Sequence, residues 1–98
     1  MNPFTFYSCS NLTTMSFPIN LKTIDIFAFQ DCMSLSFAIF PSSLTTIKSF
    51  AFYNCSSLTS ITLPNGFEEI NSRAFGDCKS LNSVTLPNSL TTINSNIF

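Results

Sequence analysis

The sequence predicts a β-rich solenoid, in which short coils of chain stack on one another around one continuous core. Three observations lead to this prediction. A unit recurs every 23 residues without an insertion, apolar and polar residues alternate in one short stretch of each unit, and proline follows that stretch. The clearest copy runs from Phe50 to Pro64, with related copies at 27–41 and 73–87 and a degraded copy at 4–18.

Equivalent positions of the repeat carry the same type of residue in most copies. The unit reads L-x-x-I-x-x-x-A-F-x-x-C-x-x-L-x-x-I-x-L-P-x-x. If the coils stack in phase, like residues lie over like residues at the ~4.8 Å spacing of neighbouring strands. The two most regular rows are Cys9, Cys32, Cys55 and Cys78, and Leu12, Leu35, Leu58 and Leu81.

The stretch 60–64 shows why each coil contains a strand. Side chains of a strand alternate between its two faces, so Ile61 and Leu63 are expected to point inward while Ser60 and Thr62 point outward. Pro64 ends the strand because it has no backbone N–H to donate.

Two further segments complete each coil. The segment 44–47, L-T-T-I, turns the chain and begins a second short extended arm. The A-F-x-x-C segment places a small alanine and a large phenylalanine inward at a tight corner, which has room for no more than a helical turn. The first copy has Thr5 in place of alanine, so we expect that copy to fray.

One coil cannot fold alone, because ordering its backbone costs about as much free energy as burying its few apolar side chains gains. Stability therefore has to come from contacts between coils. We expect residues 1–98 to form a single array of about four coils, as a fragment of a longer repeat protein without caps. Uncapped ends would leave core residues exposed, which predicts end-to-end self-association.

The repeat resembles the BspA-like class of leucine-rich repeats, the Treponema pallidum type with a 23-residue unit. The shared run is A-F-x-x-C-x-x-L-x-x-I-x-L-P, and the resemblance extends over nearly the whole chain. The resemblance implies an α/β leucine-rich-repeat solenoid that is right-handed and β-rich, with a parallel sheet on its concave face and short helical turns at the corners. Members of the class are typically surface or secreted proteins of bacteria and some parasitic protists, associated with adhesion to host proteins or other cells.

Composition argues against several kinds of partner. The chain has four Lys and Arg residues and five Asp and Glu residues, so no basic stripe is available for nucleic acid or an anionic membrane. No run approaches the ~20 apolar residues that cross a bilayer, so we expect no membrane insertion of this segment. A secretory signal is also missing, because neither a basic region nor an apolar run opens the chain.

Neither metal binding nor catalysis is predicted, and no cofactor is expected. The chain has no histidine and no closely spaced cysteine pair, which zinc sites and general-base catalysis would need. Glu68 and Glu69 are adjacent, so on an extended arm their side chains point to opposite sides and do not form a catalytic pair. Asp25, Asp31 and Asp77 fall at turn positions, where aspartate caps backbone groups. Stacking brings the cysteines near one another, but their side chains would run parallel, so we expect a row of buried thiols rather than disulfides.

The candidate site is the set of outward side chains on the concave strands. Three copies carry hydroxyl groups there, whereas Phe37 and Ile39 of the second copy are apolar. An apolar pair rimmed by hydroxyls is typical of a protein contact, although drift or cover by another segment would give the same pattern. The hydroxyl-bearing members are Thr14, Ser16, Ser60, Thr62, Ser83 and Thr85.

We interpret the chain as a non-enzymatic protein-binding module of a cell-surface adhesin-like protein, with a cytoplasmic location as the alternative. An intracellular scaffold or regulatory segment would use the same face, and a purely structural spacer would present no apolar pair. The expected partner is a protein whose identity the residues leave open. Asn11-Leu12-Thr13 and Asn54-Cys55-Ser56 are glycosylation sequons, which would matter in a protein secreted by a eukaryote.

Overall fold

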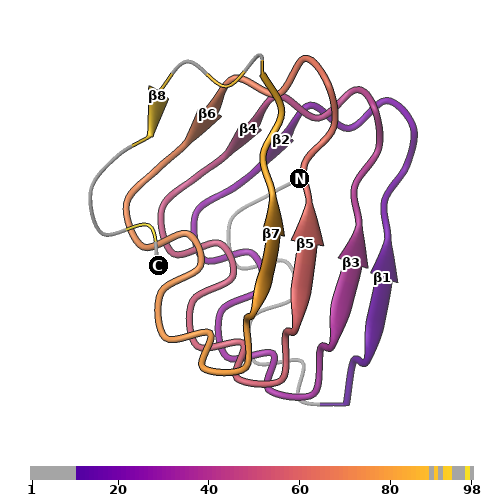
Figure 1. The fold of residues 1–98 in the computed structure, drawn as a ribbon. Helices are drawn as coiled ribbons and strands as arrows, with labels where there is room; N and C mark the ends of the chain where they lie inside the picture. Colours follow the sequence, from indigo (N-terminus) through magenta and orange to yellow (C-terminus); the bar gives the residue numbers. More distant parts are fainter. Residues whose placement is uncertain (1–10, 89, 91, 94–96, 98) are drawn as a thin grey trace.

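The structure, a computed structural model, describes residues 11–88, 90, 92, 93 and 97. In this part of the chain, eight short strands form two four-stranded parallel sheets, and successive strands alternate between the sheets (Figure 1). The first sheet has the order β1 (Thr14–Ser16), β3 (Phe37–Ile39), β5 (Ser60–Thr62) and β7 (Ser83–Thr85). The second has the order β2 (Thr23–Ile24), β4 (Thr46–Ile47), β6 (Glu69–Ile70) and β8 (Thr92–Ile93).

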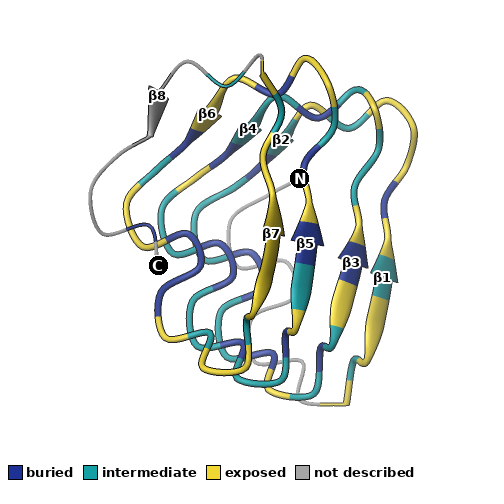
Figure 2. Ribbon diagram, in the orientation of Figure 1, coloured by how far each residue is buried: buried dark blue, intermediate teal, exposed yellow. Residues whose placement is uncertain are grey.

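The strands of the first sheet follow the alternation of apolar and polar residues. β5 buries Ile61 and β3 buries Ala38, and their outward neighbours remain wholly or partly accessible (Figure 2). The pairing is in phase with the repeat, because Thr14 pairs with Phe37 and Phe37 pairs with Ser60. The predicted direction of the side chains in this arm is therefore confirmed.

The second arm is also present, and it forms the opposite wall of the solenoid (Figure 1). Ile24, Ile47 and Ile70 are 0%, 0% and 1% exposed, and consecutive isoleucines are register partners. Side-chain hydroxyls reinforce the stacking: Ser43 Oγ donates to the carbonyl of Leu21 at 2.6 Å, one coil earlier. Each coil thus contributes one short strand to each of the two sheets.

The corners consist of turns, and the described residues contain no helix. The amide of Ala28 donates to the carbonyl of Asp25 at 3.2 Å, and that of Cys32 donates to Phe29 at 3.3 Å. Such hydrogen bonds between residues three apart would continue as a helical turn if the backbone stayed right-handed. It does not, which is why the helical turns expected at the corners are replaced by separate turns.

Two positions in each corner adopt a left-handed backbone. Asp and Asn tolerate this conformation, whereas other non-glycine residues accept it at a cost of about 1–2 kcal/mol. Hydrogen bonds to the next coil hold both positions, since the amide of Asp31 donates to the carbonyl of Tyr53 at 2.9 Å and that of Phe27 to Ser49 at 3.3 Å. The two rows are Phe27, Phe50 and Arg73, with φ from 56 to 60°, and Asp31, Asn54 and Asp77, with φ from 54 to 63°.

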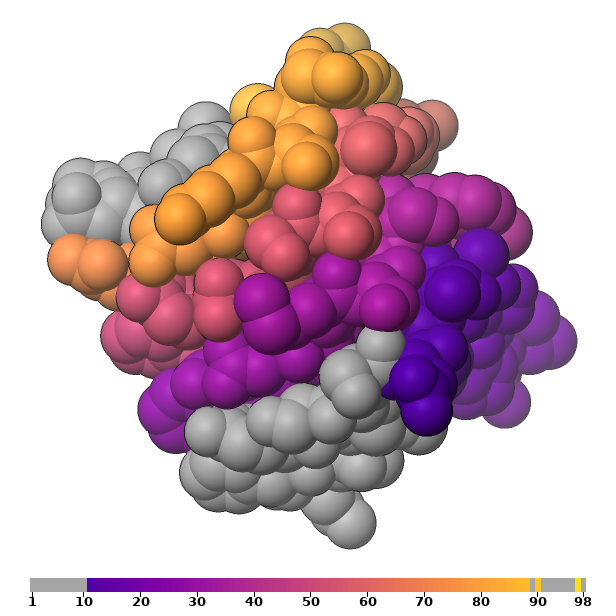
Figure 3. Space-filling view, turned by 90° about the horizontal axis from the view of Figure 1, so that it is seen from below, coloured from indigo at the N-terminus to yellow at the C-terminus, as the bar shows by residue number. Residues whose placement is uncertain are grey.

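The core consists of columns of like residues. The rings of Phe29 and Phe52 stack with centroids 5.0 Å apart, and those of Phe52 and Phe75 stack at 5.2 Å, both with interplanar angles of 4°. Leu35 and Leu58 are both 0% exposed, with Leu81 half-buried above them. The space-filling view shows the coils as successive bands of colour (Figure 3). Coil therefore lies on coil with like side chain over like.

The cysteine row has the predicted character. Cys32 and Cys55 are buried thiols, and Cys78 is a half-buried one. The thiol of Cys55 donates to the carbonyl of Phe29 at 3.1 Å, and that of Cys78 to Phe52 at 3.2 Å, each one coil earlier. These cysteines therefore serve as packing residues that also link coils. Cys9, Thr5 and the expected fraying of the first copy lie outside the described residues.

Candidate protein-binding face

The outward side chains of β1, β3, β5 and β7, here called the sheet face, lie on one side of the first sheet. The structure brings together all eight residues predicted for the site, because the repeat places them in two in-phase rows. Seven of them are exposed, and Ser60 is partly exposed. The two rows are Thr14, Phe37, Ser60 and Ser83, and Ser16, Ile39, Thr62 and Thr85.

The apolar pair on β3 is accessible. Phe37 is 43% exposed and Ile39 is 58% exposed, with buried Ala38 between them. A shallow depression of about 380 Å³ lies beside the pair, and hydroxyl groups of β5 form its other side. A volume of this size is at the low end of the range for ligand pockets and is large enough for a few side chains of a partner. The lining residues are Phe37, Ala38, Ile39, Phe40, Ser60, Thr62 and Pro64.

The sheet face carries no charged side chain, and all charged residues lie elsewhere on the chain. Lys22, Asp25, Lys48, Glu68 and Glu69 belong to the second arm or adjoin it. The remainder lie at the corner between the arms, and these are Asp31, Arg73, Asp77 and Lys79. An uncharged face with hydroxyl groups can hydrogen-bond a partner, but it cannot attract one over a distance.

Three titratable groups of the described residues have pKa values that their surroundings raise. The carboxylate of Asp77 accepts a hydrogen bond from the Tyr53 hydroxyl at 2.9 Å and raises the pKa of that hydroxyl. Burial raises the pKa of the Cys55 thiol, and it raises the pKa of the Cys78 thiol to about 11. Thiols with raised pKa values are poor nucleophiles at neutral pH. Among the described residues, no group of three or more His, Cys, Asp or Glu side chains is placed to hold a metal ion.

Two exposed apolar residues outside the first sheet were not predicted from the sequence. Ile19 is 82% exposed and Met33 is 46% exposed. The signal was available, because Ile19 occupies a position where later copies have Ser42 and Asn65, and Met33 replaces serine or lysine. Both lie outside the first sheet, so they are not part of the sheet face.

The sequence pattern places the chain in a family. The family model described as BspA type leucine rich repeat region, with six copies, matches residues 1–98. The chain therefore belongs to the BspA-type leucine-rich-repeat family, and its fold is the leucine-rich-repeat solenoid. No functionally curated protein matches the chain. In the part of the chain that the structure describes, no helix has the length and apolar character needed to span a bilayer.

Solved structures of bacterial proteins share this fold. A leucine-rich repeat protein from Bacteroides ovatus is 35% identical, with a TM-score of 0.83 over 90% of this chain. A leucine-rich cell surface protein from Faecalibacterium prausnitzii is 30% identical, with a TM-score of 0.81 over 87% of this chain. The T. pallidum leucine-rich repeat protein is 33% identical, with a TM-score of 0.68 over 87% of this chain. The chain spans 23%, 22% and 50% of these three proteins, respectively.

Proposed function

We propose that the chain is a non-enzymatic protein-binding module, that the sheet face is its contact surface, and that it belongs to a cell-surface adhesin-like protein. The observation that carries the proposal is the exposed pair Phe37 and Ile39 beside a depression lined by Ser60 and Thr62. Exposed apolar side chains with a polar rim are the usual centre of a protein contact. We further propose that residues 1–98 form a single array of about four coils within a longer repeat protein.

The absence of charge on the sheet face predicts how binding responds to ionic strength. Contacts made by hydroxyl groups and apolar side chains respond little to ionic strength, whereas steered association between charged surfaces slows as salt is added. Binding through this face should therefore be nearly independent of salt. A partner held instead by Lys22, Lys48, Glu68 or Glu69 would show the opposite response.

The test compares three versions of the chain. Wild type, the double variant Phe37→Ser with Ile39→Thr, and the control Glu69→Gln on the second sheet are immobilised and exposed to proteins solubilised from host and source cells. A protein retained by wild type is then purified and its affinity measured for all three. The double variant should lose at least about tenfold in affinity, equivalent to about 1.4 kcal/mol, while Glu69→Gln retains it.

Thermal unfolding of the same variants separates binding from folding. Both changed side chains on β3 are exposed, so the midpoint should stay within a few degrees of wild type. Unchanged affinity of the double variant would remove the sheet face from the proposal. If no version retains a protein, a structural spacer becomes the better description.

Cell-surface location is supported by the similarity to a protein described as a leucine-rich cell surface protein. The alternative, an intracellular scaffold or regulatory segment, would use the same apolar pair. Treating intact source cells with an amine-reactive reagent that cannot cross membranes distinguishes the two. Surface location predicts labelling of exposed lysines such as Lys22 and Lys79 without lysis, whereas labelling only after lysis supports the scaffold.

A further inference from the structure

Asn65 is the only asparagine of the chain that is followed directly by glycine. Asn65 and Gly66 lie between β5 and β6, outside both sheets, and both are exposed. The amide of Phe67 donates to the carbonyl of Pro64 at 3.2 Å, which closes a four-residue turn with Asn65 and Gly66 at its centre. The asparagine–glycine pair is therefore accessible to water in the middle of the array.

The backbone at Gly66 can change conformation. Gly66 has a φ of 89°, whereas the φ of Asn65 is not positive, as in a type II turn. A Cβ atom placed on Gly66 would meet no atom within 4 Å, so this side of the turn is open space. Since glycine accepts either sign of φ, the peptide group between Asn65 and Gly66 can rotate without a steric penalty at residue 66.

This rotation brings together two groups that react. Once the backbone nitrogen of Gly66 faces the side-chain Cγ of Asn65, it can bond to that carbon. Its proton passes through water to the side-chain nitrogen, which leaves as ammonia, and a cyclic succinimide forms. A water molecule then opens the ring at either carbonyl and leaves aspartate or isoaspartate at position 65. No reagent other than water is needed, and a side chain on the following residue would hinder the approach of its nitrogen.

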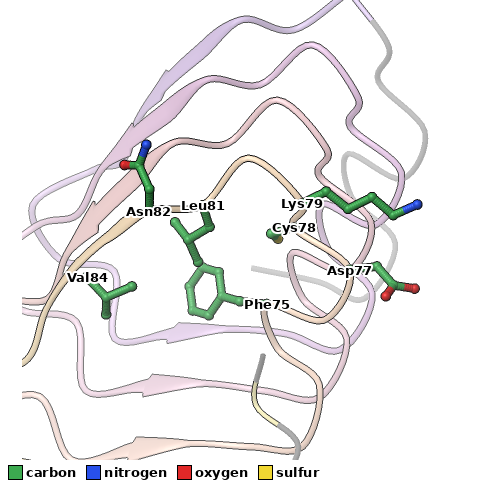
Figure 4. Close-up of a pocket in the computed structure, with 7 residues that line it drawn as sticks. All are labelled: Phe75, Asp77, Cys78, Lys79, Leu81, Asn82 and Val84. Atoms are coloured by element: carbon green, nitrogen blue, oxygen red, sulfur yellow. The ribbon is translucent and has the colours of Figure 1, made fainter.

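Asn82 provides a comparison within the same molecule. It is exposed, as is Thr59 at the same position one coil earlier, and its side chain points away from Leu81 (Figure 4). The next residue is Ser83, which begins β7 and is the register partner of Ser60. The nitrogen of Ser83 thus belongs to a paired strand and carries a residue with a side chain. Exposure alone therefore does not bring an asparagine and the next nitrogen together.

The second coil forms the same turn from other residues. The amide of Leu44 donates to the carbonyl of Pro41 at 3.1 Å, with Ser42 and Ser43 at the centre of the turn. The φ of Ser43 is not positive, so the turn does not require a left-handed residue. Serine at either central position is thus compatible with the repeat, which supplies matched variants of the third coil.

We propose that Asn65 is a site of self-modification, at which the folded chain converts asparagine into aspartate and isoaspartate without an enzyme. The conversion replaces a neutral amide by a carboxylate, so the formal net charge of the chain changes from −1 to −2. Position 65 follows Pro64, which lines the depression beside Phe37, so the new charge is one residue away from the uncharged sheet face. The modification itself does not depend on the function proposed for that face.

The two products should differ in their effect on the fold. Aspartate keeps the length of the main chain and is well tolerated in turns. Isoaspartate inserts one extra carbon into the main chain between Pro64 and the buried Phe67, so the hydrogen bond that closes the turn has to rearrange. The variant Asn65→Asp should therefore keep the thermal midpoint of wild type, whereas the isolated isoaspartate form should unfold at a lower temperature.

The first experiment incubates the folded chain at neutral and at mildly alkaline pH and follows each asparagine by peptide mass spectrometry. Digestion at acidic pH avoids further reaction, and electron-transfer fragmentation distinguishes isoaspartate from aspartate. Asn65 should convert at least about tenfold faster than Asn82, and faster at the higher pH, because the nitrogen of Gly66 has to lose its proton. Equal rates at the two asparagines would overturn the proposal. Conversion of Asn65 in urea but not in the folded chain would overturn it too, since the turn would then hold the peptide group fixed.

The second experiment uses the matched serine variants. Gly66→Ser should slow the conversion of Asn65 at least about tenfold, because residue 66 gains a side chain. Asn65→Ser keeps the glycine and should prevent the acidic form that isoelectric focusing detects in wild type. Thermal unfolding reports whether each variant folds. If the acidic form accumulates in Asn65→Ser at the wild-type rate, another residue carries the modification and the proposal is wrong. Undiminished conversion in a folded Gly66→Ser variant also contradicts it.

Discussion

The third coil, which contains residues 50–64, and the last described coil, which contains residues 73–87, have nearly the same inward residues. Their environments differ. In the third coil, Leu58 and Ile61 are 0% and 2% exposed, with a coil above and below. In the last described coil, Leu81 is half-buried and Val84 is 37% exposed. Burial in this fold therefore depends on the neighbouring coils and not on the residue alone. Four predictions test or refine this difference.

The largest effect is expected where a side chain has like neighbours on both sides. Phe52 stacks on Phe29 and Phe75 and meets the edge of Phe40 with a centroid separation of 5.8 Å. Phe52→Ala should cost about 3–5 kcal/mol, because the cavity interrupts three ring contacts at once. Phe37→Ala, at an exposed position, should cost less than about 1 kcal/mol. Urea unfolding followed by circular dichroism measures both; equal losses would show that the column of rings does not hold the coils together.

A direct form of the comparison replaces leucine at the same position of two coils. Leu58→Ala should destabilise by about 2–5 kcal/mol, the usual cost for a fully buried leucine. Leu81→Ala should cost no more than about half as much, since one side of Leu81 already faces solvent. The measurement is urea unfolding at a concentration where the mass is that of the monomer. A larger loss for Leu81→Ala would contradict the role assigned to the neighbouring coils.

Stability should fall as pH rises through the range in which thiols ionise. Burial disfavours the thiolate of Cys55 and Cys78, and it raises the pKa of Cys78 from 9.0 to about 11. Below about pH 8.5 both states keep the thiol proton and the contribution is complete, whereas at higher pH the unfolded chain loses the proton first. The free energy of unfolding should therefore decrease by about 1.4 kcal/mol per pH unit for each such thiol, up to its folded pKa.

Alanine variants identify the thiol responsible for this slope. Cys78→Ala should remove its share of the slope between pH 9 and about 11, while the share of Cys55 remains. Denaturant unfolding at several pH values gives the slopes. A stability that rises with pH over this interval would show that the sign is wrong.

The smallest effect is expected from chemical modification of the thiols of Cys55 and Cys78, which occupy the same position in the two coils. In a Cys9→Ser background near pH 8, iodoacetamide should modify Cys78 before Cys55, because Cys78 is half-buried and Cys55 is 0% exposed. Peptide mass spectrometry reports each rate. Similar rates for the two thiols would mean that modification follows unfolding of the whole array, so the two coils would open together.

Most of the fold could be predicted from the repeat. The spacing between Leu35, Leu58 and Leu81 determined the stacking, and the alternation at Ser60 to Leu63 determined which side chains point inward. The eight residues of the sheet face follow from the same two facts. These predictions depend on periodicity alone, and periodicity is a property of the sequence.

The corner conformation could not be predicted in the same way. Phe27, Phe50 and Arg73 are left-handed although none of them favours that backbone, so propensity gives no signal. Contacts between coils hold Phe27 and Phe50 there: the amide of Phe50 donates to the carbonyl of Ser72 at 3.3 Å, and the two rings stack with centroids 5.3 Å apart. The depression beside Phe37 likewise depends on how β3 and β5 pack, and no residue pattern encodes its volume.

The sequence by itself determined the repeat, the family, the inward and outward rows, and the position of the apolar pair Phe37 and Ile39. The tertiary structure alone decided how deeply each row of the described residues is buried and which corner positions have a left-handed backbone. The physical reason is that direction is set within one coil by strand geometry, whereas burial and strain depend on contacts with the coils on either side.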